Sequence, residues 1–151
     1  MFEWSSLGCY KALGTPNHVY CFLNNTQPDT QAIIVQLWSK NSKAAFYKGS
    51  HRQLLRAEAA LNGYLEIPRA NLAIEGVEYE EINMKEGGRT IIDARVGFVV
   101  IQGLVINLGF ATKEELKTWA TMKVPDIPPI RDRVEKLAIP AIGNNFELVQ
   151  S

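Results

Sequence analysis

The sequence predicts a mainly β protein of the sandwich or barrel type, with one or two peripheral helices. Three observations predict this class. Short runs rich in β-branched and aromatic residues recur along the chain, glycines and prolines separate them, and few stretches show helical spacing of apolar residues. The chain has 151 residues, without a repeat or a long linker, which predicts one domain over residues 1–151.

The first half of the chain is expected to contain five strands and one helix. We expect the strands at residues 19–23, 32–38, 44–47, 64–67 and 77–84. The run 32–38 is apolar except for Gln36, which is typical of a central strand covered on both faces. The three- and four-residue intervals among Leu54, Leu55, Glu58 and Leu61 predict a helix of two to three turns within 51–62, ended by Gly63.

The second half contains the densest β region. We expect strands at residues 89–95, 98–102 and 104–111, with glycines between them. Thr112 and Glu115 form a capping-box signature, which predicts a helix that continues through Met122. Leu116 and Trp119 fall on one face of this helix, so it should lie against the outside of the sheet. A short helix at 131–137 and a strand at 146–149 complete the prediction.

Composition bears on the partners of the protein. Sixteen basic and sixteen acidic residues balance, so no global field favours nucleic acid as a partner. An apolar run of membrane-spanning length is missing from the sequence, and the first residues lack the pattern of a secretory signal, so we expect no membrane partner and a cytoplasmic location. Cys9 and Cys21 lack CxxC spacing and are expected to be small buried hydrophobes.

Two stretches resemble landmarks of a known family. A strand and an Asn-containing turn at 36–41 lead into Tyr-Lys-Gly-Ser-His at 47–51, and a Gly-Gly turn at 87–88 leads into the strand through Arg95. Together they resemble the phytanoyl-CoA dioxygenase-like branch of the jelly-roll, or double-stranded β-helix, fold. Lys48 stands where that family has a proline. The resemblance covers roughly residues 36–111 and implies a cupin-like barrel with a cavity.

The metal ligands of that family are missing from this sequence. The family holds Fe(II) with a His-x-Asp/Glu pair and a distal histidine. Neither His18 nor His51 is followed by a carboxylate at the second position, and Gly97 or Phe98 occupies the place of the distal histidine. The expected strand of the 2-oxoglutarate-binding arginine has no arginine at 104–108. We therefore expect a degenerate member of the family, without a metal site and without a cofactor.

Polar residues on the expected central strands are candidate site residues. Asp93 and Arg95 are two residues apart on a predicted strand and should share one face, where Asp93 could act as a general base and Arg95 could orient an anionic or carbonyl group. Tyr47 completes the candidate catalytic set. The alternative for Asp93 and Arg95 is an ion pair without a catalytic role. The candidate ligand-binding residues are Gln36, Trp38, His51 and Phe98.

The one local excess of positive charge comes from Lys40, Lys43, Lys48, His51, Arg52 and Arg56. Such a cluster can bind a phosphate or a carboxylate. The alternative is a solvated basic edge, because lysines commonly protect exposed strands from pairing.

Two functions remain open from the sequence. The first is a cofactor-independent barrel that binds a small molecule, with isomerase- or cyclase-type acid–base chemistry in its cavity. The second is a non-catalytic interaction or scaffold protein with a degenerate oxygenase fold. A connected void at Gln36, Asp93 and Arg95 would favour the first, and a packed interior would favour the second. A homodimer is compatible with both, because edge strands need protection.

Overall fold

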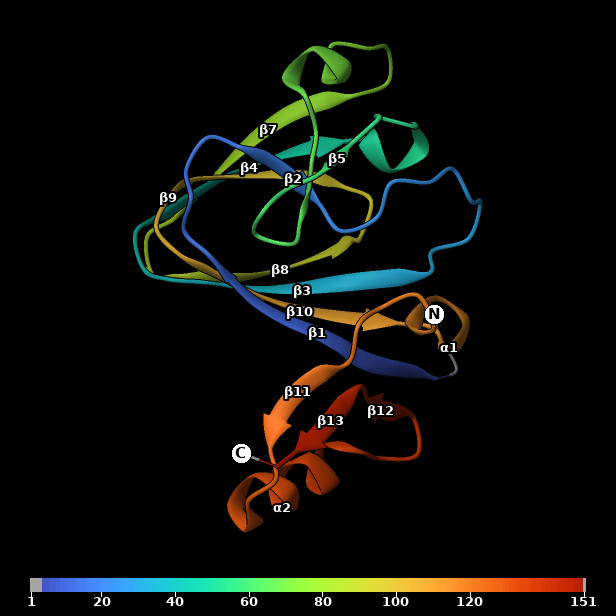
Figure 1. Ribbon diagram of the computed structural model, residues 1–151. Helices are drawn as coiled ribbons and strands as arrows, with labels where there is room; N and C mark the ends of the chain where they lie inside the picture. Colours follow the sequence, from blue (N-terminus) through green and yellow to red (C-terminus); the bar gives the residue numbers. More distant parts are fainter. Residues whose placement is uncertain (1–3, 151) are drawn as a thin grey trace.

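Two β-sheets stacked face to face form most of the molecule in a computed structural model, which describes residues 4–150 (Figure 1). Sheet A has the strand order β12 (Ile142–Asn144), β1 (Ser5–Leu13), β10 (Val105–Ala111), β3 (Ala32–Trp38) and β8 (Gly88–Asp93). Sheet B has the order β5 (Glu58–Ala59), β6 (Leu65–Glu66), β2 (Val19–Cys21), β9 (Gly97–Gln102), β4 (Ser42–Lys48) and β7 (Glu78–Met84). The predicted mainly β class is confirmed. The two large sheets are open, however, and do not form the closed barrel that the sequence led us to expect.

The chain crosses between the sheets at almost every step. It alternates from β1 to β4 and again from β7 to β10, and the neighbours within each sheet are antiparallel apart from the β1–β12 pair. β7 and β8 are the edge strands on one side of the two sheets. They are joined by a tight turn in which Gly87 has a φ of 80°, and a Cβ there would lie 2.8 Å from the Trp38 carbonyl oxygen.

The space between the sheets is packed with apolar side chains. This main core consists of Leu13, Tyr20, Trp38, Ala44, Phe46, Tyr64, Met84, Phe98, Val100 and Val105. A second cluster lies on the other face of sheet B, where residues 49–77 cover Val19, Cys21, Ala45, Tyr47 and Val99. The covering segment contains two 3-10 turns, η1 (Ser50–Arg52) and η2 (Arg69–Leu72). The central strands of sheet B are therefore buried on both faces, which explains the apolar runs at 44–47 in β4 and 98–101 in β9.

The helix predicted within 51–62 is wrong. Residues 50–52 form only a 3-10 turn, and the chain then continues irregularly to the short strand β5. Leu55 is buried whereas Leu54 and Leu61 are exposed, so these leucines do not form one apolar face. The Leu55 amide donates to Asn24 Oδ1 (3.1 Å), a tertiary bond that replaces the helical one.

The Thr112 cap is confirmed, but its helix is shorter than predicted. Helix α1 spans Lys113–Leu116, and Thr112 Oγ1 accepts a hydrogen bond from the Glu115 amide (3.3 Å). Leu116 and Trp119 pack beside Ala32 and Ala111 at one end of the main core, not on the outside of the sheet. Gly8 and Gly109 make room for the Trp119 ring, since a Cβ on either would lie within 3 Å of it.

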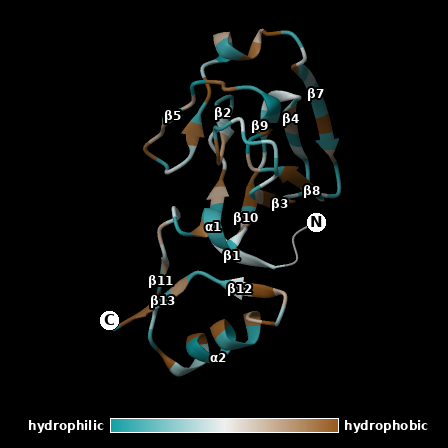
Figure 2. Cartoon of the chain, turned by 90° about the vertical axis from the view of Figure 1, so that its right-hand side faces the viewer, coloured by the Kyte–Doolittle hydropathy of each residue, from teal (hydrophilic) through white to brown (hydrophobic). Residues whose placement is uncertain are grey.

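Residues 121–150 form a C-terminal unit at the β1 side of sheet A (Figures 1 and 2). It contains β11 (Met122–Pro125), α2 (Pro128–Leu137), β12 and β13 (Phe146–Val149), so the predicted final helix and strand are confirmed. β11 and β13 pair with each other in parallel, while β12 pairs with β1. Every residue of this unit is at least partly exposed. Over the described residues, no helix is long and apolar enough to span a membrane.

Candidate functional site

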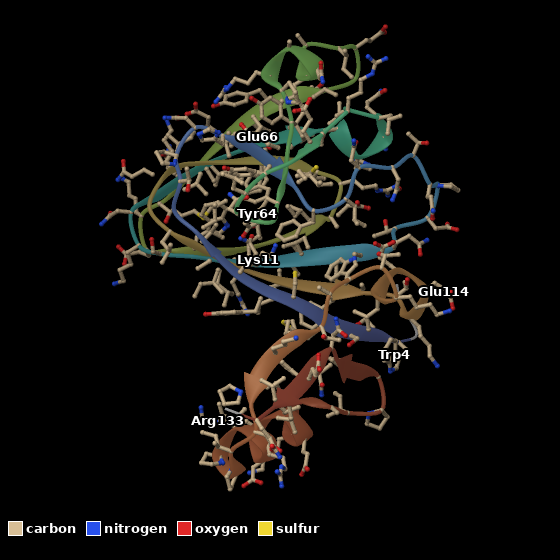
Figure 3. The ribbon with its side chains drawn as sticks, viewed as in Figure 1. Trp4, Lys11, Tyr64, Glu66, Glu114 and Arg133 are labelled. Atoms are coloured by element: carbon tan, nitrogen blue, oxygen red, sulfur yellow. The ribbon has the colours of Figure 1, made fainter. Side chains whose placement is uncertain are left out.

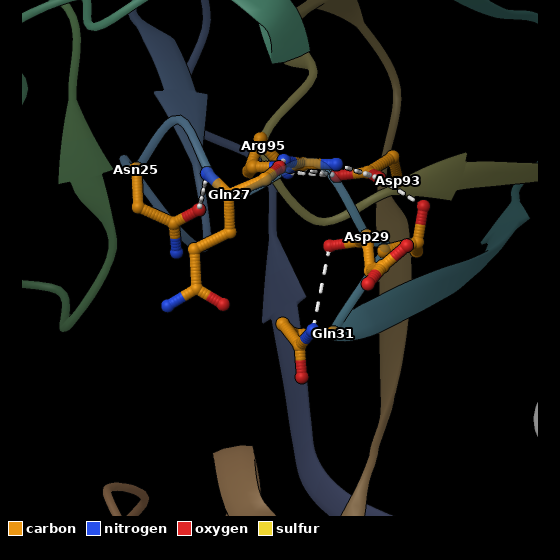
Figure 4. Close-up of polar contacts among 7 residues, drawn as sticks. Asn25, Gln27, Asp29, Gln31, Asp93 and Arg95 are labelled. Atoms are coloured by element: carbon orange, nitrogen blue, oxygen red, sulfur yellow. Dashed lines mark hydrogen bonds and ion pairs between the residues drawn. The ribbon is translucent and has the colours of Figure 1, made fainter.

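Asp93 and Arg95 form a buried ion pair where β8 ends (Figure 4). The predicted strand stops at Asp93, and Arg95 lies in the following turn, yet its side chain folds back. Arg95 Nε donates to Asp93 Oδ1 and Nη2 donates to Oδ2, both at 2.8 Å. The side chains are only 15% and 7% exposed. The two candidates are therefore together, as predicted, in the bidentate geometry that makes such pairs strong.

Further hydrogen bonds saturate the Asp93 carboxylate. Oδ1 also accepts from the Arg95 amide (2.9 Å), and Oδ2 accepts from Thr30 Oγ1 (2.8 Å). Burial alone would raise the pKa of Asp93, but the bonds from Arg95 and Thr30 outweigh it and hold the pKa below its ordinary value. A carboxylate with four donors and a lowered pKa is a poor general base. The geometry therefore favours the structural alternative for this pair.

Arg95 also holds the loop before β3 in place. Its Nη1 donates to the Gln27 carbonyl oxygen, and Gln27 is held in turn by Asn25, whose Oδ1 accepts from the Gln27 amide (3.2 Å; Figure 4). The β8–β9 turn and the loop 24–31 thus form one connected polar structure around the ion pair.

A groove of about 480 Å³ opens beside this pair, between β8 of sheet A and β4 and β7 of sheet B. Its apolar wall is formed by Phe46, Ile82, Ile92 and Val96, together with the edge residue Ile91. The groove exists because β7 and β8 are sheet edges that do not pair with each other. Its volume falls in the range of small-molecule sites, which are largely apolar with a few polar groups.

Charged groups line the groove beside its apolar wall. Lys48 Nζ lies 2.5 Å from Glu80 Oε2, and this contact raises the pKa of Lys48. Asp93, His51 and Thr90 also line the groove. The His51 Nδ1 atom is buried and has no hydrogen-bond partner among the described residues. Such a buried polar atom without a partner costs free energy.

A second hollow of about 370 Å³ adjoins the groove at His51. It is polar and cationic, because Arg52 and Arg95 line it together with the loop residues Thr26, Gln27, Pro28 and Thr30. His51 borders both hollows. The two form one candidate site, with an apolar lobe and a cationic lobe on either side of the imidazole.

The buried amide of Gln36 does not reach this site directly. Its Nε2 donates to Asn107 Oδ1 (2.9 Å), and its Oε1 accepts from Thr90 Oγ1 (2.8 Å). Thr90 also accepts from Trp38 Nε1 (3.0 Å), and Asn107 Nδ2 donates to the Tyr64 hydroxyl (2.9 Å), which lies between the sheets (Figure 3). This polar network is closed within the core. Thr90 is its one member that lines the groove.

The other predicted site residues are distributed over different surroundings. Tyr47 points to the opposite face of sheet B from Phe46 and packs edge-on against Tyr79, so it is not near Asp93. Phe98 is completely buried in the main core, and Trp38 is 5% exposed there. Of the seven predicted residues, the structure brings Asp93, Arg95 and His51 to one site.

Sequence reasoning missed several residues of the site and its support. Asn107 interrupts an apolar strand just as Gln36 does, and this shared pattern was the available signal for the network. Thr90, Ile82 and Val96 gave no such signal, because their position in the groove depends on how the two sheet edges face each other.

The described part of the chain contains neither a cluster of metal-binding side chains nor a cysteine poised as a thiolate. Between residues 4 and 150, no three His, Cys, Asp or Glu side chains gather as a metal ion would require. Cys21 is buried, and burial raises the pKa of its thiol to about 12. The pKa of Cys9 is also raised by burial, so neither is poised as a thiolate.

Comparison with protein-family models and with curated proteins found no match for this chain.

Proposed function

We propose that this protein binds a small amphipathic anion in the groove between β8 and the paired strands β4 and β7, with its head group in the adjoining cationic hollow. The observation that carries the proposal is the position of His51. It borders both lobes and has a buried Nδ1 atom without a partner. Binding that turns the imidazole toward the ligand would satisfy this nitrogen, which is otherwise costly to bury.

The lining of each lobe indicates the ligand class. The wall formed by Phe46, Ile82 and Val96 suits an aliphatic or aromatic body. Arg52 is exposed at the second lobe and makes no hydrogen bond or ion pair to a side chain among the described residues, so it is available to a carboxylate or phosphate. Lys48 and Arg95 are already paired with Glu80 and Asp93 and would contribute less.

Titration of ¹⁵N-labelled protein with octanoate, followed by amide chemical shifts, tests the proposal. We expect saturable shifts at Gly49, His51, Ile82 and Val96. The matched neutral probe 1-octanol should bind at the same residues at least about 10-fold more weakly, because it cannot pair with Arg52. Shifts confined to other surfaces, or absent altogether, would contradict the proposal.

Two variants separate the lobes. Arg52→Gln should weaken octanoate binding and leave 1-octanol binding unchanged, whereas Ile82→Phe should weaken both by filling the groove. Arg133→Gln is the matched control, since Arg133 is exposed on α2, in the C-terminal unit. Equal effects of Arg52→Gln and Arg133→Gln on octanoate would show that only general charge attraction is involved.

The fold itself is proposed to be a jelly roll related to the phytanoyl-CoA dioxygenase-like family. The strand orders β1-β10-β3-β8 and β2-β9-β4-β7, with chain crossings between them, support this, since eight strands in two facing sheets are the jelly-roll arrangement. A cytoplasmic location is part of the proposal, and the two unpaired cysteines support it.

Isomerase- or cyclase-type catalysis is a weaker form of the same proposal. It would need a base other than Asp93, whose four hydrogen bonds hold its pKa down. His51 is the other group at the site whose chemistry fits this role, because imidazole is the commonest general base in enzymes. Tyr47 lies on the opposite face of sheet B, so it could take part only from that face.

A non-catalytic interaction protein is the second candidate function. The observation that favours it is the apolar packing of the interior, where Gln36 is hydrogen-bonded to Asn107 and Thr90 and lines neither lobe of the candidate site.

A further inference from the structure

The outer face of sheet A is apolar where a solvated sheet face is normally polar. Side chains alternate along each strand, so the residues between those of the core point away from sheet B. Cross-strand register places them in adjoining rows. The outer face consists of Leu7, Tyr10, Ala12, Ile33, Val35, Leu37, Ile91, Ile106, Leu108 and Phe110, with Arg89 and Asp93 on the edge strand β8.

The central row of this face shows how open it is. Tyr10, Leu108, Val35 and Ile91 stand side by side on β1, β10, β3 and β8. Tyr10 is 58% exposed and Ile91 is 69% exposed, at the two ends of the row, and Leu37 in the next row is 37% exposed. A contiguous apolar patch across four strands is typical of an interaction surface.

The whole chain exposes more surface than its mass predicts. A compact monomer of 16.9 kDa should expose about 7,700 Å², whereas this chain exposes 9199 Å². The excess of about 1,500 Å² is larger than the roughly 800 Å² that each partner buries in a standard interface. The C-terminal unit contributes to it, because it has no buried residue and joins sheet A through β12 next to β1.

We propose that two copies of this chain form a homodimer through the outer face of sheet A. Sheets pack on sheets, and the same apolar face on both copies allows a two-fold interface. Its central row carries no charge, and the charges of the neighbouring rows, Arg89 and Asp93, lie only on the edge strand β8. The β1 edge of the same face adjoins the C-terminal unit, so one partner can cover part of both surfaces. This inference is independent of ligand binding in the groove.

Sedimentation velocity of wild-type protein and a double variant tests the interface. Wild type should sediment at twice the chain mass of 16.9 kDa. The double variant Tyr10→Lys/Leu37→Lys places two charges in the apolar rows, and its dimer dissociation constant should rise about 30-fold or more. Its far-UV circular dichroism should match wild type, because both side chains are already exposed.

Leu54→Lys/Leu61→Lys is the matched control. Both leucines are exposed, and they belong to the segment that covers sheet B. This control should remain a dimer with the dissociation constant of wild type. A monomeric wild type would overturn the homodimer, and a dimer weakened equally by both double variants, or by neither, would overturn the assignment to this face.

Discussion

At the scale of single residues, the Asp93–Arg95 pair determines how the polar end of the site is held. Its bidentate contact is buried, and the same two side chains reach Thr30 and the Gln27 carbonyl. Removing one partner of such a pair is expensive, because the other charge stays buried without compensation. The pair therefore contributes stability that depends on the ionised state of Asp93.

Asp93→Asn should lower the free energy of unfolding by about 2 to 3 kcal/mol near neutral pH, somewhat less than the loss of a fully buried pair. The folded-state pKa of Asp93 lies below its ordinary value of 3.8. The stabilisation is therefore complete well above pH 3.8 and is lost as the pH falls through the folded-state pKa. Urea unfolding of both proteins at neutral pH and at about pH 3 checks this. If wild type and Asp93→Asn differed in unfolding free energy by the same amount at both pH values, the stabilisation would not depend on ionisation of Asp93.

The sequence predicted which of these residues lie close together, but it did not predict which way their side chains point. Asp93 and Arg95 are two residues apart, so the sequence correctly brought them together, although the strand ends between them. Tyr47 and His51 flank Gly49, and only the register of β4 decides that Phe46 faces the core and Tyr47 the other layer. A one-residue difference in register therefore decides whether a side chain lines the groove or lies in the outer layer, and composition does not encode this register.

At the scale of elements, a close backbone approach joins the two ends of the segment 49–77, where it leaves β4 and enters β7. Gly49 has a φ of 85°, and a Cβ on it would lie 1.9 Å from the Gly76 carbonyl oxygen. Gly76 has a similar φ of 81°, but a Cβ there would meet nothing within 4 Å. The two glycines thus share a left-handed conformation and differ only in the space around them.

Gly49→Ala should destabilise the protein by several kcal/mol, whereas Gly76→Ala should cost only about 1 to 2 kcal/mol. The first substitution adds a backbone clash to the conformational strain, and the second adds the strain alone. Thermal unfolding of both variants measures the difference. Equal losses would mean that residues 49 and 76 separate easily, so that the close approach is not required for folding.

Strand prediction succeeded where an apolar run was bounded by turn residues, as for β3, β9 and β10. It failed for 51–62, where leucines at helical intervals serve separate purposes. It also missed β1, because Gly8 and Lys11 interrupt its apolar pattern. Gly8 makes room for Trp119, and Lys11 lies over the Tyr64 ring, so both interruptions come from tertiary contacts that local sequence does not reveal.

At the scale of the whole molecule, stability should be unevenly distributed. The two facing sheets bury nearly all of the core, while the C-terminal unit contains no buried residue. Regions with few buried apolar contacts open at a lower free energy than the core. The sheets and the C-terminal unit should therefore behave differently in exchange experiments.

Backbone amides of β11 and β13 should exchange with deuterium roughly 100-fold or more faster than those of β4, β9 and β10. Hydrogen exchange followed by mass spectrometry on the Tyr10→Lys/Leu37→Lys variant checks this without protection from a second copy. Equal protection in both regions would show that the C-terminal unit unfolds only together with the sheets.

The polar network in the core has a consequence for how the strands find one another during folding. Gln36 lies directly opposite Asn107 on β10 and opposite Thr90 on β8. If β3 slipped by two residues along β10, its apolar side chains would still face the core, but Gln36 would meet Val105 or Gly109, and both amides would be buried without partners. The amides therefore act as an alignment mark, which penalises misaligned pairings that apolar patterning alone would accept.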